Sequence, residues 1–137
     1  MMKNFLRLIL LAVISLTGCT FLSDTAADLG GYENIDVETL ETMIEERRDE
    51  FIMVNTHIPF EGNIPDTDFS VPYTEIEENL DMFPEDKDAE IVVYCLNDPM
   101  SHIAAAELTE HGYTNVKNLV GGMNAWQDAG LPLEMTP

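Results

Sequence analysis

The thiol of Cys95 is the side chain best suited to covalent chemistry in this chain of 137 residues. It directly follows Glu90–Tyr94, a run typical of a buried strand, and it precedes a polar loop and a helical pattern that begins at Ser101. At the start of a helix, unpaired backbone N–H groups and the helix dipole stabilise a thiolate or another sulfur anion. Because Asn97 and Asp98 are too polar for a protein core, we predict an accessible, reactive thiol and not a buried structural cysteine.

Cys19, the second cysteine, lies in a different context near the start of the chain. An apolar run, Leu8–Ile14, follows two basic residues and is far shorter than the ~20 residues that span a bilayer, so it is typical of a secretory signal. The next motif, Leu16-Thr17-Gly18-Cys19, resembles the bacterial lipobox, whose cysteine becomes residue one and carries lipid. We therefore expect a signal peptide over residues 1–18, lipid on Cys19, and a membrane-anchored protein outside the cytoplasm. The alternative is an ordinary signal peptide that contains a cysteine.

The chain is strongly acidic, with 26 Asp and Glu against 6 Lys and Arg and a formal charge of −20. Removal of residues 1–18 would take away Lys3 and Arg7 but no acid, and would leave a charge of −22. Such a surface repels nucleic acid and anionic lipid headgroups. We therefore expect no nucleic-acid partner, and we expect lipid, not charge, to hold the protein at the membrane.

The remaining pattern predicts one α/β domain over residues 33–137, preceded by a tether over residues 19–32. Expected helices and strands alternate, which indicates a parallel sheet flanked by helices on both faces. Ligands on such sheets sit at the carboxyl ends of the strands, where Cys95 falls. In chain order, the expected elements are a helix capped by Asp36, a strand at 51–54, a helix from Thr74 to about Leu80, a strand at 90–94, a helix at 101–111, a strand at 116–120, and a last helix closed by Gly130.

Several blocks of the sequence together resemble a rhodanese domain. They are V-V-Y-C-L-N-D-P-M-S around Cys95, then G-Y-T-N-V, L-V-G-G-M-N-A-W and A-G-L-P-L, with looser matches at residues 54–57 and 61–65. The resemblance covers roughly residues 33–134 and implies the rhodanese fold, with sulfur carried on the loop cysteine as a persulfide. Cys95 would be the nucleophile and Ser101 would close its loop. The loop amides that surround the sulfur would come from Leu96, Asn97, Asp98, Pro99 and Met100.

The loop departs from the family pattern at three positions. Met100 stands where a basic residue is usual, which removes a cation that would pair with an oxyanion. Asp98 replaces a glycine and brings a negative charge near the sulfur, and Pro99 has no backbone N–H to offer. Together with the net charge, these changes favour a neutral or thiol-type sulfur carrier over thiosulfate, which is a dianion.

Three upstream positions also differ from the family. Asn55, His57 and Asn63 stand where Asp, Arg and His are usual. His57 follows a strand, as Cys95 does, so it is a candidate substrate-binding residue that acts as acid or base toward an acceptor thiol. The alternative is a histidine on a surface loop.

Other chemistries are less well supported. Phosphatases and arsenate reductases of this fold need an Arg six positions after the Cys, and that position is Ser101. Cys95, Met100 and His102 are soft ligand types that copper could use, but a histidine in the first helical turn more often faces solvent or caps a neighbour. We therefore predict no metal and no other cofactor.

Three functions remain as hypotheses. The first is a sulfurtransferase or sulfur carrier whose partners are a small sulfur donor, a thiol acceptor or a partner protein. The second is a catalytically inactive module for binding or regulation, which would tolerate Cys95→Ser. The third is a redox sensor, although a chain lipidated at Cys19 would have no resolving cysteine.

Overall fold

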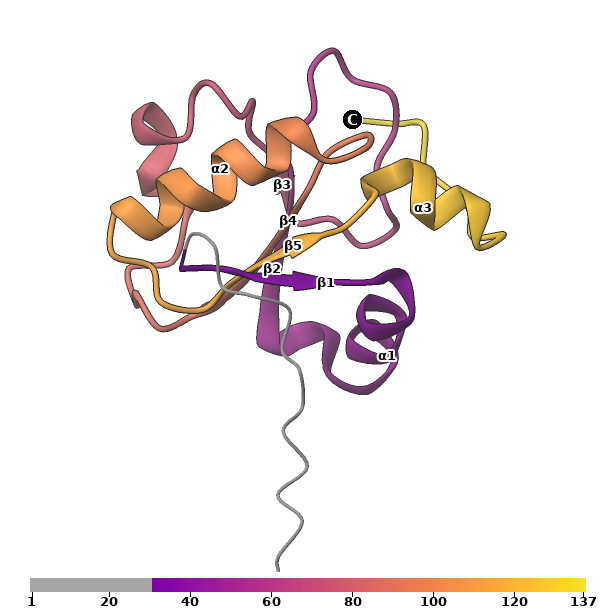
Figure 1. Ribbon diagram of the computed structural model, residues 1–137, viewed down its shortest axis with the longest axis horizontal. Coiled ribbons are helices and arrows are strands. Elements are labelled where there is room, and N and C mark those ends of the chain that lie inside the picture. Colours follow the sequence, from indigo (N-terminus) through magenta and orange to yellow (C-terminus); the bar gives the residue numbers. More distant parts are fainter. Residues whose placement is uncertain (1–30) are drawn as a thin grey trace, which may run out of the picture.

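The computed structural model describes residues 31–137 (Figure 1). The predicted signal peptide, the lipidation site Cys19 and most of the predicted tether lie outside the described residues. The helices are α1 (Val37–Arg47), α2 (Pro99–Glu110) and α3 (Gly122–Asp128), with two short 3₁₀ helices, η1 (Arg48–Glu50) and η2 (Glu77–Met82). The strands are β1 (Glu33–Ile35), β2 (Phe51–Asn55), β3 (Phe69–Ser70), β4 (Glu90–Tyr94) and β5 (Val116–Leu119). None of the helices within residues 31–137 is both long and apolar enough to cross a membrane.

The five strands form one sheet in the order β1-β5-β4-β2-β3, and every neighbouring pair is parallel. β4 lies at the centre, with Asn55 of β2 opposite Tyr94. The amino ends of all the strands therefore lie at one edge of the sheet, and the carboxyl ends lie at the opposite edge. The carboxyl edge carries the residues that follow β2, β4 and β5, and Cys95 is among them.

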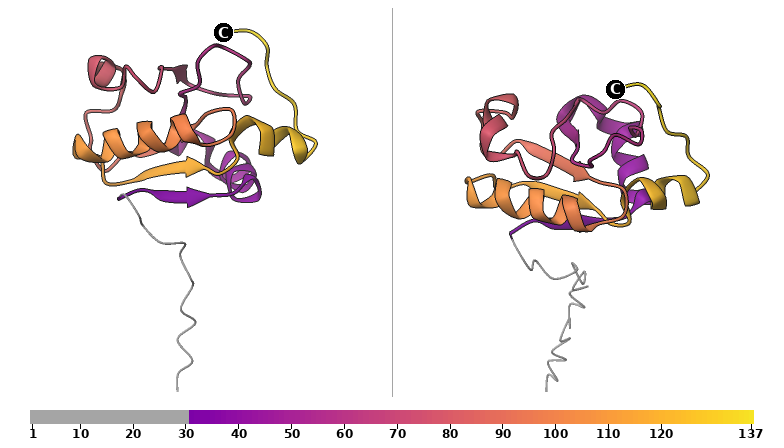
Figure 2. Two further views of the ribbon diagram at one scale, coloured as in Figure 1. Left: turned by 45° about the horizontal axis from the view of Figure 1, so that its top comes forward. Right: turned by 90° about the horizontal axis from the view of Figure 1, so that it is seen from above.

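The helices cover both faces of this sheet (Figure 2). Side chains alternate along β4, so that Val92 and Tyr94 pack on one face while Ile91 and Val93 pack on the other. The first face is covered by α1 and α3 and the second by α2 and the segment that contains η2. This arrangement confirms the predicted α/β class, a parallel sheet flanked by helices on both faces.

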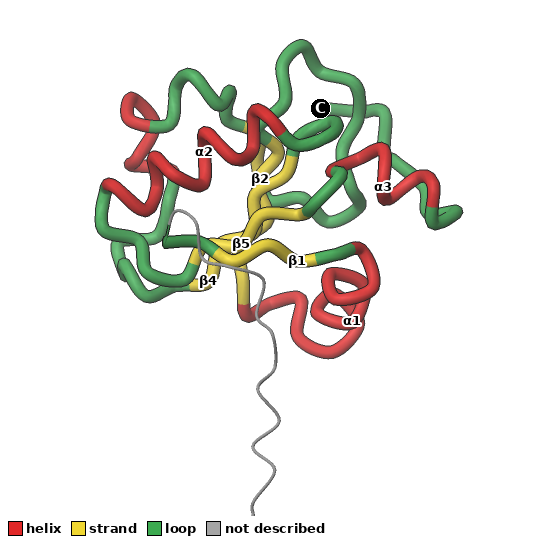
Figure 3. Tube along the Cα trace, in the orientation of Figure 1, coloured by secondary structure: helices red, strands yellow, loops and turns green. Residues whose placement is uncertain are grey.

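One predicted helix differs from the structure, and one short strand was not predicted. Thr74 does not cap an α-helix; instead a 3₁₀ helix begins at Glu77, and Asn79 has non-helical angles (φ −118°, ψ 23°) that prevent a regular α-helix. Most of the chain between β2 and β4 is loop (Figure 3). The short edge strand β1 was not predicted, whereas the expected cap at Asp36 is present, its carboxylate accepting a bond from the Thr39 amide at 2.9 Å.

Ion pairs gather at the amino edge of the sheet. Glu90, the first residue of β4, is bound through both carboxylate oxygens by the guanidinium of Arg47, and this pairing lowers the pKa of Glu90 below its ordinary value. Lys117 contacts Glu33 and lies 3.6 Å from Glu90. Arg48 binds Asp68 at 2.7 Å. These contacts fix the starts of β1, β2 and β4 relative to one another.

The C-terminal segment folds back over the face that α3 covers. Asn63 and Glu134 exchange two backbone hydrogen bonds of 2.8 Å, which form an isolated antiparallel bridge. The indole of Trp126 donates to the Pro132 carbonyl at 2.9 Å. This segment therefore packs against the loop that follows β2, at the same edge as Cys95.

Candidate active site around Cys95

Cys95 lies at the carboxyl end of β4, as predicted, and its sulfur faces the first turn of α2. Two groups in the described part of the chain donate hydrogen bonds to Sγ: the Asp98 amide at 3.1 Å and the Ser101 hydroxyl at 3.3 Å. The Ser101 hydroxyl also lies 3.0 Å from the Asp98 carbonyl, so its single hydrogen is shared between two acceptors. Both donors aim positive charge at the sulfur, which is the arrangement that stabilises a sulfur anion.

Two predictions about this site are wrong in detail. Cys95 was predicted to be accessible, but it is only 1% exposed. The loop amides were expected to surround the sulfur, but within residues 31–137 only that of Asp98 donates to it. The physical reason is that α2 begins at Pro99 and not at Ser101, because proline suits the first helical position. Pro99 also has no backbone N–H, so it cannot donate to the sulfur.

The Gly121-Gly122 turn closes the other side of Cys95. The amides of Met123 and Asn124, in the first turn of α3, donate to the carbonyls of Cys95 and Leu96 at 2.9 Å each. A Cβ placed on Gly122 would lie 2.1 Å from the Cys95 carbonyl oxygen, and Gly122 has a φ of 52°. Only glycine allows this approach. The double glycine follows the predicted strand at 116–120, and the family resemblance implies a turn near the active site there, but the residue types do not specify the contact with Cys95.

Asp98 holds the loop to that turn. Position 98, where the resemblance implies glycine, has a φ of 127°, a conformation that is strained for any residue with a Cβ. Its carboxylate accepts a hydrogen bond from the Gly121 amide at 2.7 Å. The negative charge of Asp98 is therefore engaged by the backbone of the turn, while its own amide points at Sγ. Asp98 is thus a positioning residue that joins the two segments next to Cys95.

His102 lies one turn into α2 and binds neighbours on both sides of its ring. Its Nδ1 is 2.8 Å from the Tyr32 hydroxyl, and its Nε2 is 3.4 Å from the Asn118 amide nitrogen and 3.9 Å from the Asp98 carboxylate. Burial raises the pKa of Tyr32 above its ordinary value. Both ring nitrogens therefore lie near polar groups of the protein. These contacts also bring Tyr32, at the end of the predicted tether, against the helix that follows Cys95.

His57 follows β2 at the same edge as Cys95, but residues 31–137 show no contact between the two side chains. The imidazole is buried, its Nε2 lies 2.5 Å from the Glu61 carboxylate, and its Nδ1 is buried without a partner. The expected surface-loop alternative is therefore wrong. Glu61 was not predicted as its partner, although the spacing of four residues was visible in the sequence.

The two asparagines that replace family residues form a buried network beneath this loop. The Asn55 amide donates to the Gly62 carbonyl and to the Asn63 side-chain oxygen, both at 2.9 Å. The Tyr94 hydroxyl accepts from the Ile64 amide at 3.0 Å, and burial raises the pKa of Tyr94 to about 12. The network contains no ionised side chain, and it ties the loop that follows β2 to the end of β4.

The other predicted site residues of the loop differ in their exposure to solvent. Leu96 packs partly into the core shared with α1 and α3, Asn97 is exposed, and Pro99 is exposed at the start of α2. Met100 is half-buried. The exposed part of the loop is therefore formed by Asn97 and Pro99, while Leu96 packs toward the core.

Comparison with known proteins agrees with this fold. The family model of the rhodanese-like domain matches residues 31–129. A sulfurtransferase of Allochromatium vinosum is 35% identical over 102 residues, which cover 72% of this chain and 92% of the relative. A tRNA uridine(34) hydroxylase of Erwinia tasmaniensis is 28% identical over 141 residues, but the match covers 96% of this chain and only 40% of the relative. The crystal structure of a rhodanese-like domain protein from Staphylococcus aureus superposes with a TM-score of 0.64 at 26% identity, covering 76% of this chain and 98% of that one. The chain belongs to the rhodanese-like domain family.

Proposed function

We propose that this protein is a sulfur carrier or sulfurtransferase that holds one sulfur atom on Cys95 as a persulfide. The observation that carries the proposal is the pair of donors, the Asp98 amide and the Ser101 hydroxyl, that point at Sγ. Because a persulfide is an anion, these donors would stabilise it as they stabilise a thiolate. The name sulfurtransferase of the relative from Allochromatium vinosum supports the same chemistry.

The sulfur transfer requires no outside oxidant. The Cys95 thiolate attacks the outer sulfur of a donor R–S–SH, so that a bond forms between Sγ and that sulfur and the S–S bond of the donor breaks. The electron pair leaves on R–S⁻, which takes up the proton that Cys95 released. An acceptor thiolate then attacks the outer sulfur of the Cys95 persulfide, and Cys95 leaves as the thiolate. Because Sγ is buried, the loop Leu96–Met100 must move to admit either partner.

A thiol-type persulfide suits this site better than thiosulfate. Met100 and Asp98 replace the cation and the glycine of the family pattern, and His57 is paired with Glu61. A dianion would meet no Lys or Arg on the loop. The charge of −20 also opposes binding of a nucleic-acid substrate. It therefore argues against a role of this chain in tRNA hydroxylation, the activity for which the longer relative is named.

The best test measures the intact mass of a Cys19→Ser protein, in which Cys95 is the only thiol, after separate exposure to glutathione persulfide, polysulfide and thiosulfate. We expect a gain of one sulfur atom that cyanide removes, fastest with glutathione persulfide. The matched control is the Cys19→Ser, Cys95→Ser protein, which should gain nothing. If folded protein with reduced Cys95 gains no sulfur from any donor, the carrier function is wrong.

One observation favours a second candidate, a non-catalytic binding module. Cys95 is as buried as the core residues around it, and Pro99 removes an amide from its loop. A module of this kind would keep its fold and its partner when Cys95 is replaced by serine. Retained partner binding together with failure to load sulfur would select this function.

The second part of the proposal is that lipid on Cys19 anchors the protein to a membrane outside the cytoplasm. Its support is the Leu16-Thr17-Gly18-Cys19 motif directly after a short apolar run. Metabolic labelling with a tritiated fatty acid and detergent phase separation test it. The native protein should be labelled and enter the detergent phase, whereas Cys19→Ser should be unlabelled; label on the variant would contradict the proposal.

A further inference from the structure

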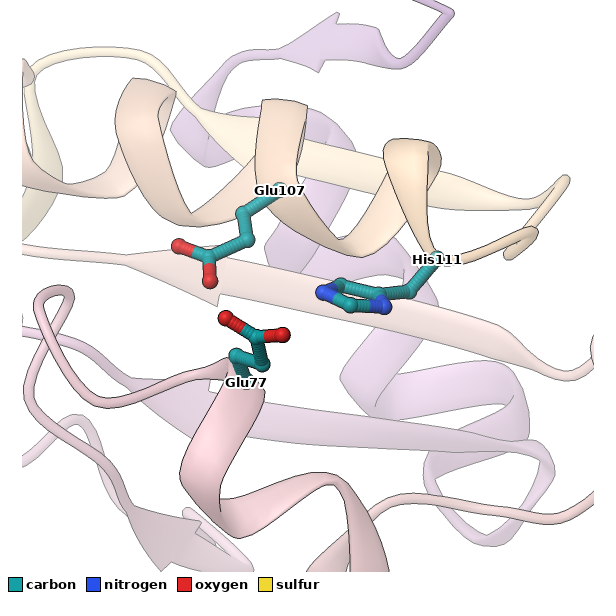
Figure 4. A group of neighbouring side chains, drawn as sticks. All are labelled: Glu77, Glu107 and His111. Atoms are coloured by element: carbon teal, nitrogen blue, oxygen red, sulfur yellow. The ribbon is translucent and has the colours of Figure 1, made fainter.

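A second group of chemically active side chains lies at the far end of α2 from Cys95. Glu107 of α2, His111 directly after that helix, and Glu77 of η2 point toward one another (Figure 4). One ligand atom from each residue lies within 4.8 Å of the other two. The group is therefore formed by two elements and contains one imidazole and two carboxylates.

The backbone holds these residues in place independently of their charges. Glu107 and His111 are four positions apart, so both project from the same face of α2. The segment that carries Glu77 is fixed against α2 by Ile76 and Leu80, which belong to the same core as Leu108. Core packing thus brings the two carboxylates together although they repel each other.

No cationic side chain compensates for that repulsion. The described part of the chain has four Lys and Arg residues. Arg47 and Lys117 contact Glu90, Arg48 contacts Asp68, and Lys87 lies over the Tyr113 ring at 3.8 Å.

We infer that Glu77, Glu107 and His111 bind a divalent transition-metal ion, for which Zn²⁺ is the best match. An imidazole with two carboxylates is a donor set that Zn²⁺ accepts, whereas Ca²⁺ takes six to eight oxygen ligands and Mg²⁺ retains most of its waters. Tetrahedral bonds of about 2.0–2.1 Å place ligand atoms about 3.4 Å apart, so the group needs a small closure. Glu77 is exposed and its side chain can supply this closure by rotation. Three protein ligands leave the fourth position to water.

The ion would join η2 to α2, the helix whose first turn forms the Cys95 loop. The site is independent of the proposed sulfur chemistry, because its residues lie at the opposite end of α2. Its direct effect is therefore on the stability of the helix pair.

The test uses the full chain in detergent, with Cys19 and Cys95 replaced by serine so that no thiol binds zinc, after treatment with EDTA. Isothermal titration with Zn²⁺ should show one site per chain, and Zn²⁺ should raise the melting temperature. Glu77→Gln, Glu107→Gln and His111→Gln should each weaken binding at least tenfold and remove the rise in melting temperature. Matched controls are Glu110→Gln and His102→Gln, which remove an acid and an imidazole from the same helix and should leave the affinity within about twofold.

Two outcomes would overturn the inference. Equal binding by the parent and the three site variants would place the ion elsewhere. Equal weakening by the site variants and by Glu110→Gln would mean that zinc responds only to the overall negative charge. Circular dichroism of the metal-free variants establishes that each is folded.

Discussion

The two edges of the central sheet differ in which groups lie next to their negative charges. The amino edge holds the four Lys and Arg side chains of residues 31–137, namely Arg47, Arg48, Lys87 and Lys117, and three of them are in ion pairs with acids. The carboxyl edge holds Cys95 and has no such side chain in the described part of the chain. The amino edge therefore pairs its acids with Lys and Arg, whereas at the carboxyl edge the Cys95 sulfur and the Asp98 carboxylate accept hydrogen bonds from neutral amide and hydroxyl groups.

This difference bears on which sulfur compounds the site can use. At the carboxyl edge, a negative charge on sulfur is stabilised by one amide and one hydroxyl, whose reach is short and whose charges are partial. Such donors suit a charge centred on Sγ, but they do little for the distant oxygens of an incoming dianion. The edge is thus suited to holding a bound sulfur anion more than to attracting an anionic donor.

The largest effect is expected for Gly122→Ala, which disrupts the backbone contact at the carboxyl edge. Its Cβ would lie 2.1 Å from the Cys95 carbonyl oxygen, so the free energy of unfolding should fall by about 3 kcal/mol and sulfur loading should be lost. Gly130→Ala is the control, since Gly130 has a φ of 83° but no heavy atom near its Cβ, and it should cost only about 1 kcal/mol. Chemical denaturation checks both values. Equal losses would contradict the role of the contact.

Met100→Arg sharpens the comparison by adding a cation to the edge that has none. We expect the rate of sulfur loading from thiosulfate to rise by about tenfold relative to loading from glutathione persulfide, because a guanidinium pairs with an oxyanion. Met82→Arg is the control, since Met82 is exposed on η2 and the substitution changes the net charge equally. Mass-spectrometric loading rates with each donor test the prediction. An equal rise in both variants would assign the effect to net charge alone.

Glu90→Gln weakens the amino edge and should change the dependence of stability on pH. Pairing with Arg47 lowers the pKa of Glu90 in the folded protein, so its stabilisation is present above the unfolded value and is lost as the pH falls through the folded value. At pH 7 the variant should lose about 1 kcal/mol of stability. Below about pH 4.3 the difference between the two proteins should shrink. Urea denaturation between pH 3 and pH 7 measures this, and a constant difference would contradict it.

Asp98→Gly should have the smallest net effect on stability, because it removes one destabilising feature, the backbone strain, and one stabilising feature, a hydrogen bond. Glycine relieves the strain of a φ of 127° but loses the bond to the Gly121 amide, so the free energy of unfolding should change by less than about 1 kcal/mol. Asp98→Ala, which loses the bond and keeps the strain, should cost about 2 kcal/mol. Thermal unfolding of the two variants compares them. Equal costs would show that the backbone at position 98 is not strained.

Much of the fold could be predicted because the decisive signals are local. The strand at 90–94 was predicted with its observed bounds, since a continuous apolar run of that length is typical of a central parallel strand. β1 was missed because three residues with a single buried side chain, Ile35, produce no periodic pattern. η2 was predicted as an α-helix because the cap signal at Thr74 is local, whereas the kink at Asn79 is not visible in the residue types.

The position of the reactive residue could also be predicted, but its environment could not. Cys95 stands at a strand end in the sequence itself. Its burial depends on Gly122 and Met123, which are distant in the chain and reach it only through the crossover from α2 to β5. The bond between Asp98 and Gly121 is of the same kind. Contacts of this type depend on how the loops meet, and residue types alone do not specify that.

The parallel course of β1 has a consequence for how the protein would face its surroundings. Because β1 runs parallel to β4 and Glu33 lies level with Val92 across β5, the chain enters the sheet on the amino side of Cys95, about 10 Å away along the strand direction (Figure 1). A protein attached to a bilayer through the residues before Gly31 would therefore present its thiol on the side remote from the point of attachment. Sulfur donors and acceptors would then reach Cys95 from the aqueous phase and not from the lipid.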